Sequence, residues 1–247
     1  MRYGIISDIH SNIEAFEATL RRLSREGVDQ YIFCGDLIGY GPDPQACVDL
    51  YAQLVEDGLV QGVIGNHDAI VVHPELQAYF NIEALKVLNW TMKKLSAQQM
   101  RQVSFLPAVA NGENFTVVHG TPRDPIKEYF VNTLQYRSLY KEWKGQILFV
   151  GHTHIPFYMS GNETRCRIHE ITEEKAIILQ NKYRYVINPG SVGRPRDNDT
   201  RASFGLWDTH AETFLFLREP YDFRKTKQKM KKAGFSDLLV EGLEIGL

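Results

Sequence analysis

Five short polar blocks, each following an apolar run, constrain the fold of this chain more than any other feature of its sequence. In chain order the blocks are Asp8-Ile9-His10, Gly35-Asp36, Gly65-Asn66-His67-Asp68, His119-Gly120 and Gly151-His152-Thr153-His154. The apolar runs before them span 3–6, 31–34, 63–64, 115–118 and 147–150. Because a strand buried on both faces forms a continuous apolar run, the pattern predicts polar side chains at the ends of core strands.

Strands and helices are expected to alternate in the first part of the chain. A strand over 2–7 is followed by a helix whose apolar residues recur at helical spacing and which Asn12 can cap. A strand over 29–34, a helix over 48–54 and a strand over 61–64 continue the pattern. This alternation predicts a parallel sheet with functional loops at the carboxyl ends of its strands.

The rest of the chain is predicted to be helical at first and then mainly β-structure. Residues 74–101 are expected to be helical, and Asn111-Gly112 is a strong hairpin signal. Later strands are expected over 147–150, 156–159, 165–170, 184–187, 203–208 and 213–217. A last helix over 223–232 carries a run of lysines and arginines, which indicates a solvated face or a contact for an anionic ligand. With no internal repeat or Ser/Gly linker, one domain over 1–247 is the simplest prediction.

The bulk properties exclude several classes of protein. A net charge of -2 gives no general attraction to nucleic acid or to an acidic membrane. No apolar stretch approaches the ~20 residues that span a bilayer. The three cysteines (Cys34, Cys47 and Cys166) lack C-x-x-C spacing, so no disulfide framework is expected. The strand predicted at 2–7 leaves no room for a cleavable signal peptide. The expected location is therefore the cytoplasm.

The residue types in the five blocks point to metal binding. Asp8 and His10 are two residues apart, so in an extended segment both side chains would lie on one face. His152 and His154 repeat this spacing, and the carboxylate of Asp36 could bridge two cations. Ligands of this kind, without thiolates, suit Mn²⁺, Fe, Zn²⁺ or Co²⁺. Two such ions roughly 3.5–4 Å apart could activate water for displacement at phosphorus.

The alternative interpretation of each block is structural. A single histidine after a strand is usually a capped or solvent-facing residue, and Asp36 alone could cap a turn. Five blocks at five strand ends, taken together, favour the metal site.

In their order along the chain and in their residues, the blocks resemble the motifs D-x-H, G-D, G-N-H-D, H and G-H-x-H of the calcineurin-like metallophosphoesterase superfamily. The resemblance covers 8–154 and implies an α/β fold, a four-layer α/β/β/α sandwich of two mixed sheets with two metals between them. It implies that the first metal is bound by Asp8, His10, Asp36 and His154. It implies that the second metal is bound by Asp36, Asn66, His119 and His152. His67 would lie beside the metals and donate a proton to the leaving group or hold the phosphate.

Two further segments, 35–44 and 188–196, resemble the small bacterial and archaeal phosphodiesterase branch of this superfamily. The chain departs from the phosphoprotein phosphatases at Gly39-Tyr40, where those enzymes carry an Asp-Arg pair. In those enzymes the Asp of the pair contacts the histidine that corresponds to His67, and the Arg binds the phosphate. The departure argues against a protein Ser/Thr phosphatase and against a raised pKa for His67.

Phosphate contacts must then come from other residues. Arg194 and Arg196 lie in a Gly/Pro-rich loop, and guanidinium groups match phosphate oxygens; both could equally be exposed or pair with nearby aspartates. Arg123 follows His119 closely and is a further candidate. Tyr40 could stack on a base or ring, or pack against its own loop.

The resemblance implies a binuclear metal-dependent phosphoesterase that hydrolyses phosphodiester or small phosphate ester bonds by attack of a metal-bridging hydroxide. An alternative is a hydrolase of dinucleoside polyphosphates such as diadenosine tetraphosphate, and a third is a non-catalytic scaffold on the same fold. The expected cofactors are two divalent ions, Mn²⁺ first, with Fe, Zn, Co or Ni as alternatives. The expected partner is a small phosphate ester or a nucleotide, not a membrane or nucleic acid. Homo-oligomerisation is left open.

Overall fold

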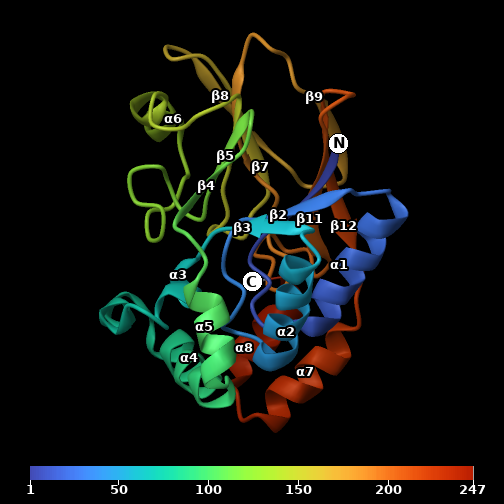
Figure 1. The fold of residues 1–247 in the computed structure, drawn as a ribbon. Coiled ribbons are helices and arrows are strands. Elements are labelled where there is room, and N and C mark those ends of the chain that lie inside the picture. The colour runs from blue at the N-terminus through green and yellow to red at the C-terminus, as the bar shows by residue number, and fades with distance from the viewer. Residues whose placement is uncertain (247) are drawn as a thin grey trace.

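The computed structural model describes residues 1–246 and contains two six-stranded sheets that face each other (Figure 1). The first sheet has the order β3-β2-β1-β11-β12-β9 and the second β4-β5-β6-β10-β7-β8. The strands of the first are β1 (Arg2–Ile6), β2 (Gln30–Phe33), β3 (Val60–Gly62), β9 (Lys175–Ile178), β11 (Ala202–Asp208) and β12 (Thr213–Glu219). Those of the second are β4 (Val109–Asn111), β5 (Phe115–Val118), β6 (Ile147–Phe149), β7 (Phe157–Gly161), β8 (Cys166–Glu170) and β10 (Arg184–Asn188).

Both sheets are mixed, as expected. In the first, β1 pairs in parallel with β2, and β2 with β3, whereas β11 runs antiparallel to β1. In the second, β5, β6 and β10 are parallel, with antiparallel strands on either side. The strands that lead into the five polar blocks are all members of these parallel groups. Their carboxyl ends therefore bring the blocks to one edge of the sandwich.

Three apolar clusters define four layers. Between the sheets, Ile5 and Ile32 of the first pack with Phe149 of the second. A second cluster joins the outer face of the first sheet to α1 (Ile13–Arg25) and α2 (Pro44–Glu56). The third joins the outer face of the second sheet to α6 (Thr133–Leu139), which lies on the far side of the molecule from α1 (Figure 1). The predicted α/β/β/α sandwich is confirmed.

Local signals in the sequence account for where the helices begin. The side chain of Asn12 accepts a hydrogen bond from the Ala15 amide and caps α1, as predicted. The region expected to be helical over 74–101 is divided into a 3₁₀ helix η1 (Pro74–Tyr79) and two α-helices, α4 (Ile82–Lys94) and α5 (Ala97–Ser104). The divisions occur because Asn81 and Ser96 each cap the helix that follows. The last predicted helix is α7 (Phe223–Lys232).

Four elements have no counterpart among the predicted ones, namely α3 (Asn66–Ala69), α6, β9 and α8 (Asp237–Ile245). Helix α8 is held by tertiary contacts, since its buried face packs against Val87 of α4 and Met230 of α7. Its N-cap residue, Ser236, makes no side-chain cap hydrogen bond. Ser236 at the N-cap, Asp237 in the first turn and Gly246 at the C-cap are nevertheless typical of helix ends, and the sequence prediction missed this helix although they were present.

The basic run in α7 is partly structural. Lys229 Nζ lies 2.6 Å from a carboxylate oxygen of Glu14 and 2.9 Å from those of Asp43. Lys225 pairs with Glu14 at 3.0 Å, and Lys227 pairs with a glutamate of α8. These three lysines tie α7 to its neighbours, so the run is not simply the solvated face that was expected.

Among the helices of residues 1–246, none has both the length and the apolar character that crossing a membrane requires.

Candidate metal centre

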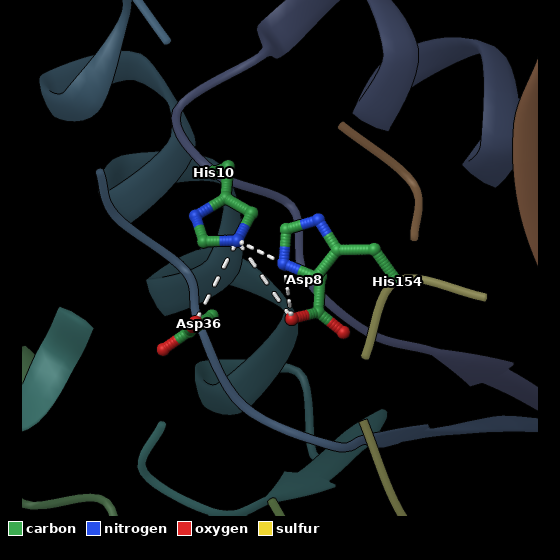
Figure 2. Close-up of side chains that lie close together, drawn as sticks. All are labelled: Asp8, His10, Asp36 and His154. Carbon is green, nitrogen blue, oxygen red and sulfur yellow. Dashed lines mark hydrogen bonds and ion pairs between the residues drawn. The ribbon is translucent and has the colours of Figure 1, made fainter. Parts of the chain in front are cut away.

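Six buried side chains from four of the strand-end blocks meet in two groups of possible ligands that share Asp36. The first group is Asp8, His10, Asp36 and His154, and the second is Asp36, His119 and His152. Within each group the ligand atoms lie within 4.8 Å of one another. Figure 2 shows the four side chains of the first group pointing toward a common centre. Asp36 belongs to both groups, which is the arrangement expected of a carboxylate that bridges two cations.

Asn66, the remaining predicted ligand, lies beside the second group. Its Oδ1 is 3.0 Å from Nε2 of His119. All seven predicted ligand side chains therefore lie in or beside the two groups.

Five of the candidate ligands have a left-handed backbone conformation, which directs their side chains toward the centre. The φ angles are 52° at Asp8, 48° at His10, 62° at Asp36, 69° at His152 and 62° at His154. The extended segment predicted at Asp8 and His10 is therefore wrong, because each strand ends before its ligands and turns sharply. Non-glycine residues rarely adopt positive φ, and such strained positions cluster at functional sites.

Two glycines permit the close approach of the strand-end loops. A Cβ atom on Gly35 would lie 2.7 Å from Nδ1 of His119, and one on Gly65 would lie 2.0 Å from Oδ1 of Asp36. Gly35 also has a φ of 96°, which other residues rarely adopt. These positions require glycine because any side chain would displace a ligand.

Backbone carbonyls orient the four histidines. Each ring uses one nitrogen to donate to a carbonyl oxygen, which leaves the lone pair of the other nitrogen to bind a metal. The pairs are His10 Nδ1 with Ile38 (3.1 Å), His119 Nδ1 with Cys34 (2.8 Å), His154 Nδ1 with Arg194 (2.6 Å) and His152 Nε2 with Lys127 (3.1 Å).

The donor atoms at the centre fit a bound cation. Among residues 1–246, no group donates a hydrogen bond to the buried oxygens Oδ1 of Asp8 and Oδ2 of Asp36. The Nε2 atoms of His10 and His154 face each other at 3.0 Å (Figure 2). Buried polar atoms without partners are costly, and two facing imidazole nitrogens repel unless a proton or a cation lies between them. Divalent cations would satisfy all four atoms.

The charges of the ligands also suit metals. Burial raises the pKa of Asp8 and of Asp36, but the neighbouring histidines outweigh it and hold both pKa values well below the ordinary range. Burial lowers the pKa of His152 to about 4 and that of His154 to about 3. For His119, burial is outweighed by Asp36, which raises the pKa to about 9. The site thus offers two ionised carboxylates and two neutral imidazoles before any metal displaces a proton from His119.

His67 lies beside the centre but outside both ligand groups. Its ring is 4.8 Å from that of His10, 4.6 Å from that of Tyr40 and 4.8 Å from that of Phe80. Burial, with the nearby His10, lowers its pKa well below the usual value although Asp36 acts in the opposite direction. This direction agrees with the expectation that the pKa of His67 is not raised.

The loop at Gly39 explains why no carboxylate contacts His67 there. A Cβ atom on Gly39 would lie 2.3 Å from Nδ1 of His67, and Gly39 has a φ of 100°. The loop therefore packs directly against the imidazole and leaves no space for an aspartate side chain.

The predicted substrate-binding residues occupy different places. A cleft of about 250 Å³ over the centre is lined by Tyr40 and Arg196, together with His67 and several ligands. Arg196 Nη2 is 3.3 Å from the hydroxyl of Tyr40. Arg194 is buried behind Tyr40 and donates to a carbonyl of α8. Arg123 is exposed and pairs with Glu128, so its substrate contact stays a prediction.

Two residues at the centre had no role assigned from the sequence. The ring of Tyr129 stacks on His152 with centroids 3.8 Å apart and planes 7° apart. No local pattern marks this tyrosine. Asp68 is the last residue of the third polar block, two residues after Asn66. That position could have suggested that it holds the ligand loop in place.

Asp68 links two of the ligand loops. Its buried carboxylate accepts hydrogen bonds from the backbone amides of Leu37 (3.1 Å), Ile38 (3.0 Å) and Gly65 (3.1 Å). It therefore fixes the chain just after Asp36 relative to the chain just before Asn66.

The substitution Asp68→Ala is expected to lower the free energy of unfolding by about 3 kcal/mol, because three buried amides would lose their acceptor. Chemical denaturation of the metal-free protein measures this change directly. Asp57→Ala, at an exposed position after α2, is the control. An equal loss in the two variants would show that Asp68 does not hold the loops together.

Comparisons with known proteins agree with this geometry. A family model described as a calcineurin-like phosphoesterase superfamily domain matches residues 1–212. An uncharacterized protein of Methanocaldococcus jannaschii is 32% identical over 98% of this chain and 97% of its own. The crystal structure of a metallophosphoesterase from Sphaerobacter thermophilus is 35% identical, with a TM-score of 0.87 over 100% of this chain and 99% of its own. A hypothetical protein from Pyrococcus horikoshii has a TM-score of 0.81 at 20% identity, covering 100% and 98% of the two chains.

Proposed function

The chain belongs to the calcineurin-like phosphoesterase superfamily, and from the geometry of its centre we propose that it is a binuclear metal-dependent phosphodiesterase. The observation that carries this proposal is the shared position of Asp36. Its Oδ2 lies between His10 and His119 and has no hydrogen-bond partner within residues 1–246. Two divalent cations, Mn²⁺ first among the candidates, would activate water and neutralise charge on the phosphoryl oxygens.

The side chains around the centre have separate tasks in this proposal. Asp8 and Asp36 supply the negative charge that holds the cations, and the carbonyl-bonded histidines fix the positions of the donor atoms. Arg196 faces the cleft and can donate to a phosphate oxygen, while its contact with Tyr40 limits its movement. His67 is placed to donate one hydrogen bond to the bound phosphate.

A substrate panel tests the proposal. Protein stripped of metal with a chelator and reloaded with Mn²⁺ should hydrolyse bis(4-nitrophenyl) phosphate, and 4-nitrophenyl phosphate more slowly. Metal analysis should find two ions per chain. Failure of added metal to restore turnover of any ester would refute the proposal, and a single bound ion would refute its binuclear part.

Diadenosine tetraphosphate belongs in the same panel as the alternative substrate. Tyr40 and Arg196 at the cleft support this alternative, since such a substrate needs an aromatic ring on which a base can stack and cationic contacts for its phosphates. Release of nucleotides at a rate above that of the simple diester would favour the alternative. If metal bound and no ester or anhydride were hydrolysed, the scaffold function would remain.

A further inference from the structure

A second hollow, of about 980 Å³, continues from the cleft over the candidate metal centre. It runs between the start of α4 and helix α8, which lie side by side in the lower part of Figure 1. The two hollows share Tyr40, Phe80, Asn81 and Arg196. A phosphate at the centre could therefore carry an organic group that extends into this second hollow, here called the α4–α8 groove.

The walls of the α4–α8 groove carry exposed aliphatic side chains. Ile82 of α4 is 74% exposed, and Leu238 and Ile245 of α8 are 71% and 53% exposed. Single exposed aliphatic residues are ordinary, but these three line one groove together with the ring of Phe80. Concave, mainly apolar surfaces beside a few polar groups are typical of small-molecule sites.

The charges in the groove are unevenly placed. Both of its arginines, Arg194 and Arg196, lie against the ring of Tyr40, at the end next to the metal centre. Along the rest of the walls, Lys86 pairs with Glu83 at 2.8 Å, and Glu241 adds another carboxylate. This distribution suits one anionic phosphate at the arginine end and an uncharged group beyond it. A polyphosphate chain extending along the groove would meet carboxylates and apolar side chains.

We propose that the α4–α8 groove binds an apolar or aromatic ester group of the substrate. The inference rests on the proposed function and narrows it to phosphodiesters in which at least one alcohol or phenol is bulky and uncharged. Ile82 and Leu238 are the specificity-determining residues, since they are the most exposed of the apolar wall and have the most surface to lose to a ligand.

Binding of two symmetric diesters tests the groove. Diphenyl phosphate and dimethyl phosphate carry the same single charge and differ only in their organic groups. Calorimetry on the Mn²⁺-loaded protein should show diphenyl phosphate binding about tenfold more tightly, because one ring is buried in the groove. In the double variant Ile82→Ser/Leu238→Ser this preference should fall to about twofold, with the affinity for dimethyl phosphate unchanged. The matched control is Leu134→Ser on α6, at a position 67% exposed and outside the groove.

Several results would overturn the inference. Equal affinities for the two diesters in the wild type, or a preference that the double variant retains, would show that the groove does not hold the ester group. Sedimentation velocity on the same proteins tests whether a second copy of the chain occupies the groove instead. If the double variant changed the oligomeric state and kept the preference, the groove would be an interface between copies of the chain. Should diphenyl phosphate bind as expected while no ester is hydrolysed, the proposed function would fail and the groove assignment would stand.

Discussion

Asp36→Asn is expected to reduce metal-dependent diester hydrolysis about a thousandfold and to leave at most one tightly bound metal per chain. Asp36 is the only side chain shared by the two groups of ligands found in residues 1–246, so its charge would act on both cations. Metals contribute several kcal/mol of charge stabilisation to such reactions, and about 4 kcal/mol corresponds to a thousandfold change in rate. The rate should be measured with saturating Mn²⁺ beside metal analysis of the same sample.

Asparagine is the informative substitution at this position because it is close to isosteric with aspartate. Asp36 Oδ1 accepts a hydrogen bond from the His67 amide at 2.9 Å, and an amide oxygen can accept it too. A loss of activity would then reflect the missing charge rather than a collapsed loop. Asp57→Asn, at an exposed carboxylate, is the control. Unchanged metal content and rate in Asp36→Asn would show that Asp36 is not a shared ligand.

His67→Ala is expected to lower kcat/KM about a hundredfold while both metals remain bound, because His67 lies beside the ligand groups and not within them. Its pKa is lowered, chiefly by burial, so the ring is neutral near pH 7 and should act as a hydrogen-bond donor to the phosphate. The loss should therefore be similar for a 4-nitrophenyl ester and for an alkyl ester. Because burial keeps the pKa of His67 well below its usual value, protonation of this ring should not affect the wild-type rate at neutral pH or above.

The leaving group separates the two roles open to His67. A much larger loss for the alkyl ester, which needs a proton on its departing oxygen, would identify His67 as the general acid. Loss of metal from the variant would instead place His67 among the ligands. His73→Ala is the matched control, since His73 is exposed and lies outside the cleft.

Much of the centre could be predicted because its ligands are local to strand ends. Each block combines a buried strand with the polar residues that follow it, and parallel strands bring their carboxyl ends to one edge. The glycines at 35 and 65 belong to the same local pattern, and the structure shows why they are required. The backbone at Asp8 and His10 was predicted less well, because a left-handed turn leaves no clear signal in residue type.

The surroundings of the centre depended on contacts between segments far apart in the chain. Arg194 and Arg196 are two residues apart, yet one is buried against a carbonyl of α8 and the other faces the cleft. Arg123, by contrast, pairs with Glu128 within its own loop. Residue type and spacing do not specify which way such side chains point.

By itself, then, the sequence determined that ligand-type side chains follow buried strands, since strand patterning and metal-binding chemistry both reside in residue type and order. The resemblance of its motifs to a known superfamily implied the four layers and the seven candidate ligands. Only the tertiary structure decided which arginine reaches the cleft and that a groove continues from it. The physical reason is that packing places these side chains: α8 is held against α4 and α7 by Leu239, Val240 and Leu243. Leu238 of α8 and Ile82 of α4 are more than 150 residues apart in the chain, so the groove that both line exists only once the chain has packed.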